Sequence, residues 1–214
     1  MLSEVLLLVK LYKTVPITHS SEVEECVAKL KTKFPIVLKS STGTQTGVGV
    51  VIVESMRSLK ALVQMTLLYN KHLPLIIQEF VPIDYDIRVI VCEGQILGAM
   101  KREVITGDGR SNVSLGAEAS KIDLTAIEKS EALRIAKAFG TRLSGIDLLP
   151  ADDREKEKPY CLEVNSNPGF RGIEKYVGGI TTQFVNIFKD KTLWNQNNPE
   201  LNTEEVIIQE RWTL

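Results

Sequence analysis

A carboxylate and an amide oxygen stand two residues apart in the last third of the chain, as Glu163 and Asn165 in the β-rich run 160–165. This run predicts a strand. Because side chains alternate along a strand, the two oxygen donors are expected on one face together with Cys161. The opposite face is apolar and is predicted to be buried; it holds Tyr160, Leu162 and Val164. A hard divalent cation can bind to such a pair of oxygen donors.

A second carboxylate completes this candidate metal site. Asp147 is the one charged residue in the apolar run 143–149, and the polar turn 152–158 joins that run to the next strand. The resulting hairpin is expected to bring Asp147 close to Glu163 and Asn165. Burying a carboxylate costs free energy unless it is paired or binds a metal. For Asp147 or Glu163 taken alone, a solvated acid is the alternative. Two carboxylates and an amide, without histidine, suit Mg²⁺ or Mn²⁺ shared with nucleotide phosphates.

Two loops carry candidate phosphate contacts. Residues 40–49 form a glycine- and threonine-rich loop between two β-rich runs, where backbone N–H groups can turn toward a phosphate. A plain turn is the alternative, since no Gly-Lys-Ser/Thr sequence follows. Lys39 precedes this loop at the end of an apolar strand, within reach of such phosphates. Arg110 lies in a second glycine-containing loop and is either a further phosphate contact or a solvated arginine.

Residues 78–81 end a β-rich run just before Pro82, which marks a change of direction and an expected boundary between two lobes. Backbone groups at such a junction can bind the edge of an adenine ring, with Phe80 or Val81 packed on the ring. A simply buried strand is the alternative. We therefore expect two lobes, residues 1–81 and 82–189, followed by a polar tail, residues 190–214.

The elements that must position these residues follow from hydrophobic periodicity and from capping signals. Helices are predicted at residues 2–13, 22–31, 56–70, 125–139 and 174–189. Strands are predicted at 15–18, 36–39, 48–53, 75–81, 87–91, 96–100, 143–149 and 160–165. The second helix is expected to begin with a capping box from Ser21 to Glu24, and the third with a cap at Ser55. The helix at 125–139 is expected to bury Ile127, Ala132, Leu133, Ile135, Ala136 and Phe139.

The composition is that of an ordinary globular protein, with 214 residues of which 43% are hydrophobic and 25% charged. A net charge of −1 gives no electrostatic reason to expect nucleic acid or an anionic membrane as a partner. The three cysteines lie far apart, which favours reduced thiols and a cytoplasmic location. His19 and His72 are expected at the surface, and no Ser–His–Asp arrangement is evident, so a protein nucleophile is not expected.

Taken in order along the chain, these motifs resemble those of the ATP-grasp superfamily and, within it, the ribosomal-protein glutamate ligase (RimK-like) branch. The similarity covers about residues 2–188 and rests on Lys39, the glycine loop and residues 78–80, 86–88, 107–112, 145–147, 163–169 and 172–175. The resemblance implies an α+β ATP-grasp fold whose two lobes hold ATP between them with Mg²⁺ or Mn²⁺.

The resemblance also implies a role for each matching residue. ATP is expected to bind to Lys39, Gly43, Thr44, Gln45, Gly47, Gln78, Glu79, Phe80, Val81, Asp86, Arg110 and Asn112. The metal is expected on Asp147, Glu163 and Asn165, and Arg110 is an expected catalytic residue that contacts phosphate. Apart from the resemblance, Arg102 or Arg171 is expected to contact a substrate carboxylate or the acyl phosphate, and Arg102 is included among the expected catalytic residues.

The reaction implied is ATP-dependent ligation of a carboxylate to an amine through an acyl phosphate, on an amino acid or on a peptide or protein carboxylate. The alternative is a shortened nucleotide-binding module that has lost ligation and binds a partner. Two departures from the family bear on this choice. Residues 114–117 read Ser-Leu-Gly-Ala where the glutamate ligase has His-Arg-Gly-Gly. The family's separate N-terminal domain has no counterpart here, so a homo-oligomer that covers the corresponding surface is a further expectation.

Overall fold

The computed structural model describes residues 13–40, 49–104, 117–190 and 192. The chain divides into two compact units, each described here by itself. The N-terminal unit holds the described residues of Leu11–Asp86 and Lys101–Ser120, and the C-terminal unit holds the described residues of Ile87–Met100 and Lys121–Leu214. The lobe boundaries expected from the sequence, 1–81, 82–189 and 190–214, stay a prediction.

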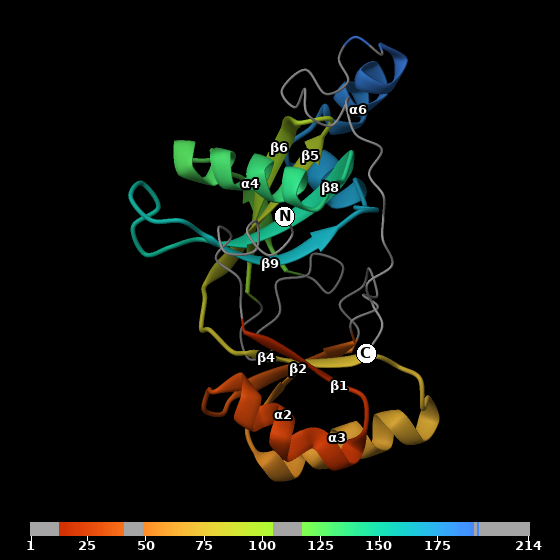
Figure 1. Cartoon of the computed structure of the whole chain (residues 1–214). Coiled ribbons are helices and arrows are strands. Elements are labelled where there is room, and N and C mark those ends of the chain that lie inside the picture. Colours follow the sequence, from red (N-terminus) through yellow and green to blue (C-terminus); the bar gives the residue numbers. More distant parts are fainter. Residues whose placement is uncertain (1–12, 41–48, 105–116, 191, 193–214) are drawn as a thin grey trace. The chain divides into compact units, whose positions relative to one another are not determined.

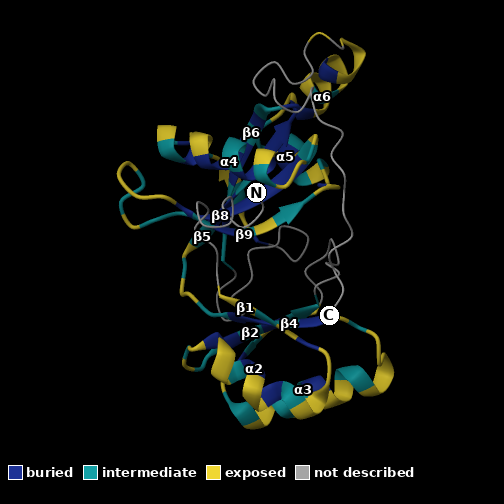
Figure 2. Cartoon of the chain, in the orientation of Figure 1, coloured by how far each residue is buried: buried dark blue, intermediate teal, exposed yellow. Residues whose placement is uncertain are grey.

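The N-terminal unit is built on a four-stranded antiparallel sheet in the order β1-β4-β2-β3 (Figure 1). Its strands are β1 (Thr14–Ile17), β2 (Ile36–Ser40), β3 (Val50–Val53) and β4 (Leu75–Glu79). Two helices, α2 (Val23–Leu30) and α3 (Met56–Tyr69), cover one face of this sheet. The core between helices and sheet is apolar and closed to water, and includes Ile17, Leu30, Ile36, Leu59 and Ile77 (Figure 2).

Local signals explain where these helices begin. The cap predicted at Ser55 is confirmed, because its Oγ accepts a hydrogen bond from the Ser58 backbone N–H at 3.2 Å. The capping box predicted from Ser21 to Glu24 is wrong. Instead, the 3-10 turn η1 (Ser20–Glu22) leads into α2, and no side chain caps that helix. The Glu22 side chain accepts from the Thr18 hydroxyl upstream, and this contact holds the entry to the turn.

The second sheet has five strands in the order β7-β6-β5-β8-β9. They are β5 (Tyr85–Cys92), β6 (Gln95–Glu103), β7 (Ala119–Lys121), β8 (Leu143–Leu149) and β9 (Tyr160–Asn165). The turn between β5 and β6 falls at Glu93 and Gly94, as expected, and both residues have positive φ. The short strand β7 was not predicted from the sequence. The mixture of helices and antiparallel sheets confirms the α+β class.

Three helices complete the C-terminal unit: α4 (Ala126–Ala138), α5 (Arg171–Tyr176) and α6 (Ile180–Lys189). The single helix predicted at 174–189 is wrong, because Gly178 and Gly179 adopt φ of 76° and 73° and break it into two. The Glu174 carboxylate accepts hydrogen bonds from the backbone N–H groups of Gly179 and Thr181, and so closes the turn that starts α6. No helix among the described residues is long and apolar enough to cross a membrane.

The buried face of α4 differs from the prediction. Phe139, expected in the core, is 52% exposed, whereas Glu128 and Glu131 are buried. These carboxylates are buried because each is paired with a basic side chain, Glu128 with Arg154 and Glu131 with Lys158.

Candidate metal and nucleotide site

The predicted metal residues meet on the hairpin of β8 and β9. In the antiparallel register Asp147 lies opposite Glu163, and Gly145 lies opposite Asn165. Cross-strand partners and residues two apart share a face of the sheet, so the three oxygen donors point to one side. Asp147 is 5% exposed, while Glu163 is open to solvent. The hairpin thus brings the three side chains together as predicted, with the carboxylates on neighbouring strands.

A β-bulge alters the rest of this strand. The register shifts between Asp147, which pairs with Glu163, and the next residue of β8, which pairs with Cys161. Leu162 is the extra residue, so strict alternation is interrupted there. Cys161 is consequently buried and does not share the face of Glu163, so the prediction that these two residues lie on one face is wrong. The prediction of a buried opposite face is also wrong, because Tyr160, Leu162 and Val164 are only half-buried.

Arg88 extends the row of charged side chains onto a third strand. It lies directly opposite Asp147 in the β5–β8 register, so Arg88, Asp147 and Glu163 form a row across three adjacent strands. The guanidinium binds Asp147 through two hydrogen bonds: Nε donates to Oδ1, and Nη2 donates to Oδ2 at 2.6 Å. Such paired, charge-assisted bonds are among the strongest that a protein makes.

Gly145 provides the space that this arrangement requires. A Cβ atom at Gly145 would lie 2.8 Å from Cβ of Pro168 and 3.4 Å from Cδ of Arg88. Pro168 belongs to the loop that follows Asn165, and the Asn165 side chain holds this loop by accepting a hydrogen bond from the Asn167 backbone N–H at 2.9 Å. The close approach of the loop and of the arginine stem therefore depends on a residue without a side chain.

The donors fit a hard cation. No three His, Cys, Asp or Glu side chains among the described residues lie close enough to hold a metal, which excludes a zinc-type cluster from this part of the chain. Asp147, Glu163 and Asn165 offer oxygen atoms alone, the ligands that Mg²⁺ prefers when it also binds phosphates. Their role as ligands stays a prediction.

The candidate nucleotide residues of the N-terminal unit lie on the four-stranded sheet. Lys39 pairs with Ile76, and Val37 pairs with Gln78. Lys39 and Gln78 therefore share one face, and it is opposite to the face whose residues Leu38 and Ile77 pack in the core under α2 and α3. This places both predicted contacts on the side of the sheet that the two helices leave uncovered.

The end of β4 offers mainly backbone groups and apolar side chains. Gln78 is buried, and its Nε2 donates to the Thr14 hydroxyl at 3.0 Å. Glu79 accepts from the Lys13 backbone N–H at 3.1 Å. Phe80 is half-buried and Val81 is 37% exposed, just beyond the end of the strand. The side chains of Gln78 and Glu79 are thus engaged within the protein, whereas Phe80 and Val81 are accessible.

Two predicted site residues bind each other. Arg102 donates from Nε and Nη2 to the two carboxylate oxygens of Asp86, at 2.6 and 2.7 Å. The Asp86 side chain is 3% exposed and that of Arg102 is 7%. The remaining predicted contacts, Gly43, Thr44, Gln45, Gly47, Arg110 and Asn112, lie outside the described residues.

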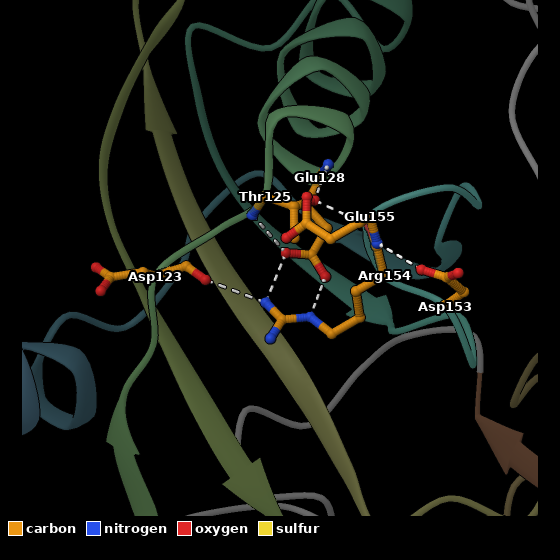
Figure 3. Close-up of polar contacts among 6 residues, drawn as sticks. All are labelled: Asp123, Thr125, Glu128, Asp153, Arg154 and Glu155. Atoms are coloured by element: carbon orange, nitrogen blue, oxygen red, sulfur yellow. Dashed lines mark hydrogen bonds and ion pairs between the residues drawn. The ribbon is translucent and has the colours of Figure 1, made fainter.

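A further arginine network, which we did not expect from the sequence, fixes the loop between β8 and β9 (Figure 3). Arg154 donates from Nε and Nη2 to the two oxygens of Glu128, both at 2.8 Å, and from Nη2 to the Asp123 carbonyl at 3.1 Å. Glu128 and Thr125 also form a reciprocal capping box at the start of α4. The Thr-x-x-Glu spacing signals that box in the sequence, but nothing local signals its arginine partner.

Arg88 was also missed as a site residue. The available signal was an arginine inside the apolar run of β5, because such a residue needs an acidic partner when it is buried.

The chain is similar to known proteins of one family. Residues 4–187 match the model of a RimK-like ATP-grasp domain. The chain is 38% identical over 146 residues to a probable alpha-L-glutamate ligase of Picosynechococcus sp., an alignment that covers 67% of this chain and 46% of that protein. It is 34% identical over 173 residues to a probable alpha-L-glutamate ligase of Halorhodospira halophila, over 78% of this chain and 55% of that one. The chain spans about half the length of the curated relatives it matches.

Solved structures share the fold at lower identity. A RimK domain protein ATP-grasp from Sphaerobacter thermophilus superposes with a TM-score of 0.60 at 22% identity, over 86% of this chain and 65% of that chain. D-alanine–D-alanine ligase from Bacillus anthracis gives 0.60 at 17% identity, over 86% and 64%. The ATP-grasp ligase PsnB, in complex with a phosphomimetic variant of its minimal precursor, Mg and ADP, gives 0.60 at 20% identity, over 86% and 56%. These similarities confirm the expected ATP-grasp fold.

Proposed function

The chain belongs to the RimK-like ATP-grasp family, and on that premise we propose that it is an ATP-dependent carboxylate–amine ligase. The products would be an amide or peptide bond, ADP and phosphate. The observation that carries the proposal is the convergence of Asp147, Glu163 and Asn165 on the β8–β9 hairpin. A protein that only binds a partner has no need for two carboxylates and an amide gathered on one face of a sheet.

The proposed reaction needs no nucleophile from the protein. An oxygen of the substrate carboxylate attacks the γ-phosphorus of ATP, and the bond to the ADP oxygen breaks. The substrate amine then attacks the acyl carbon, phosphate leaves, and the nitrogen gives up a proton. Phosphoryl transfer of this kind depends chiefly on positioning and on neutralising charge, and this agrees with the sequence, which shows no catalytic triad.

The described residues have distinct parts in this proposal. Lys39, on the uncovered face of the first sheet, would contact phosphates, while Phe80 and Val81 would pack on the adenine ring. Asp86 would bind the nucleotide, and Arg102 would hold the Asp86 carboxylate in place. Arg102 would therefore act chiefly by positioning Asp86. Arg110 keeps its predicted catalytic role.

Asp147, Glu163 and Asn165 would hold Mg²⁺ or Mn²⁺. When bound there with ATP, the cation would neutralise phosphate charge. Because the strand ladder sets the spacing of the three side chains, they would hold the cation at a defined place on the sheet.

The substrate carboxylate is proposed to belong to an amino acid or to a peptide or protein. Glutamate is one candidate for the added amino acid because of the names of the relatives. The Ser-Leu-Gly-Ala sequence at 114–117 favours a different carboxylate contact from that of the glutamate ligase, and Arg171, exposed at the start of α5, is a candidate for it.

The decisive experiment is a screen of purified protein for ADP release with single amino acids, dipeptides and peptide acceptors. Amide formation is read as a mass gain on the acceptor. We expect ADP to form only when both a carboxylate and an amine are supplied. The Asp147→Asn, Glu163→Gln double variant should lose metal-dependent nucleotide binding in calorimetry, and an unchanged affinity for Mg-ATP would show that the metal residues are misassigned. Tight ATP binding without any amide product would favour the alternative, a nucleotide-binding module without ligase activity.

Two further expectations remain part of the proposal. A homo-oligomer is testable by measuring molecular mass in solution across a range of protein concentrations. A cytoplasmic location is testable by fractionation of cells that express the tagged protein.

A further inference from the structure

We propose that Arg88 neutralises Asp147 when no metal is present, and that it thereby makes tight binding of a divalent cation depend on the nucleotide. The inference rests on the metal site of the proposed function. It goes beyond that function because it says that Arg88, which is not a metal ligand, controls when the metal binds. The partner in question is a hydrated divalent cation, such as Mn²⁺ or Mg²⁺.

The guanidinium of Arg88 already pairs with the Asp147 carboxylate, to which a cation would bind. The guanidinium contacts both oxygens of Asp147, in a pair whose side chains are 16% and 8% exposed. A carboxylate has about four lone-pair positions, and the arginine fork uses one on each oxygen. A metal ion that reaches Asp147 must therefore share this carboxylate with Arg88 or displace it.

The charge balance gives the arginine its effect on metal affinity. The row of Arg88, Asp147 and Glu163 carries one net negative charge, whereas the two acids alone would carry two. A dication is attracted less strongly to this row than to the two acids without the arginine. The Arg88–Asp147 pair is largely buried, so water screens this difference in attraction only in part. The phosphates of a nucleotide bring additional negative charge, which offsets the guanidinium and restores the attraction.

The structure keeps Arg88 in this position by more than the ion pair. Arg88 sits directly across from Asp147 in the strand register, and Gly145 leaves the space through which its stem passes. Because the backbone ladder fixes both residues, it keeps the guanidinium beside the Asp147 carboxylate. Neutral or acidic groups that orient metal ligands typically raise metal affinity about 10- to 100-fold. Arg88 is positively charged and repels a cation, so we expect an effect of similar size with the opposite sign.

The test measures binding of Mn²⁺ by electron paramagnetic resonance of the free ion, with and without ADP. Wild-type protein should bind Mn²⁺ alone at least about tenfold more weakly than Mn²⁺ with ADP. Arg88→Gln, which removes the charge and keeps hydrogen-bonding groups, should bind Mn²⁺ alone about 10- to 100-fold more tightly than wild type. Arg88→Lys, which keeps the charge, should bind Mn²⁺ alone as weakly as wild type.

Arg142→Gln is the matched control. Arg142 also bridges β5 and β8, since its guanidinium contacts the buried Glu93 carboxylate and its carbonyl accepts from the Glu93 N–H at 2.7 Å. The two bridges lie toward opposite ends of the strand pair, separated by roughly 17 Å of strand, which exceeds the screening length in physiological salt of about 8 Å. The Mn²⁺ affinity of Arg142→Gln should equal that of wild type.

The outcomes separate the two proposals. If wild type binds no Mn²⁺ even with ADP, the metal site of the proposed function fails. If wild type binds Mn²⁺ with ADP but equally tightly without it, the role of Arg88 is overturned, and this result needs no variant. Unchanged or weaker binding by a folded Arg88→Gln protein, or tighter binding by Arg88→Lys, would overturn it as well.

Discussion

Removing the guanidinium of Arg154 should destabilise the protein far more than its position in a surface loop suggests. Arg154 makes two 2.8 Å hydrogen bonds to Glu128, whose side chain is 1% exposed, so Arg154→Ala would remove the basic partner of a buried carboxylate. Breaking a fully buried ion pair costs about 3–5 kcal/mol. The Arg154 side chain is itself 28% exposed, so water can partly replace it, and we discount the loss to about 2–3 kcal/mol.

The assay is urea unfolding followed by circular dichroism, with the free energy extrapolated to water. The control is Lys156→Ala in the same loop, where the pair with Asp153 is exposed on both sides, 82% and 43%, and should contribute less than about 1 kcal/mol. Thr125→Ala removes the cap and the hydrogen bond from the Thr125 hydroxyl to the Arg154 carbonyl, and it should cost about 1 kcal/mol. If Arg154→Ala unfolds with the same free energy as Lys156→Ala, the buried pair contributes little and the reasoning is refuted.

Three other predictions concern the thiols, acid stability and packing. Burial raises the pKa of the Cys92 thiol to about 11, so iodoacetamide should not label it in native protein at pH 8 but should do so in urea; rapid native labelling, seen by mass spectrometry, would contradict this. Hydrogen bonds from the backbone and hydroxyl of Thr181 lower the pKa of Glu174, so its contribution to stability is present above the ordinary value of 4.5 and is lost as pH falls through the lowered pKa. The difference in unfolding free energy between wild type and Glu174→Gln should therefore be largest near neutral pH and vanish in acid, and a difference that persists at pH 2 would argue against the contact. Gly98→Ala should cost about 1–3 kcal/mol, since the new Cβ would lie 2.6 Å from Cδ1 of the buried Ile180; unchanged stability in urea would mean that α6 shifts freely on β6.

Much of the β8–β9 hairpin was predictable because its signals are local. Alternation along two β-rich runs and a polar turn between them are sufficient to place Asp147 beside Glu163, as the register shows. The cap at Ser55 was predictable for the same reason, since the hydroxyl and the N–H group that it binds are three residues apart.

The features that escaped prediction depend on partners far away in the sequence. Arg88 is 59 residues from Asp147, and Arg154 is 26 residues from Glu128. The helical pattern of α4 alone gives no sign that Glu128 is buried, because its partner Arg154 lies outside the helix. The pattern also gives no sign that Phe139 is exposed. The bulge at Leu162 likewise arises from pairing with β8, and a single strand carries no sign of it.

The burial of every cysteine in the chain has a practical consequence for spectroscopy. The protein contains three cysteines, Cys26, Cys92 and Cys161, and all three thiols are buried. A cysteine introduced at Tyr69, which is 89% exposed at the end of α3, would therefore react with a maleimide dye ahead of the native thiols. A second one at Phe139, on α4, would give a donor–acceptor pair with one dye on each unit. Energy transfer between the two dyes would then report the distance between the units as nucleotide is added, in protein that keeps all of its own cysteines.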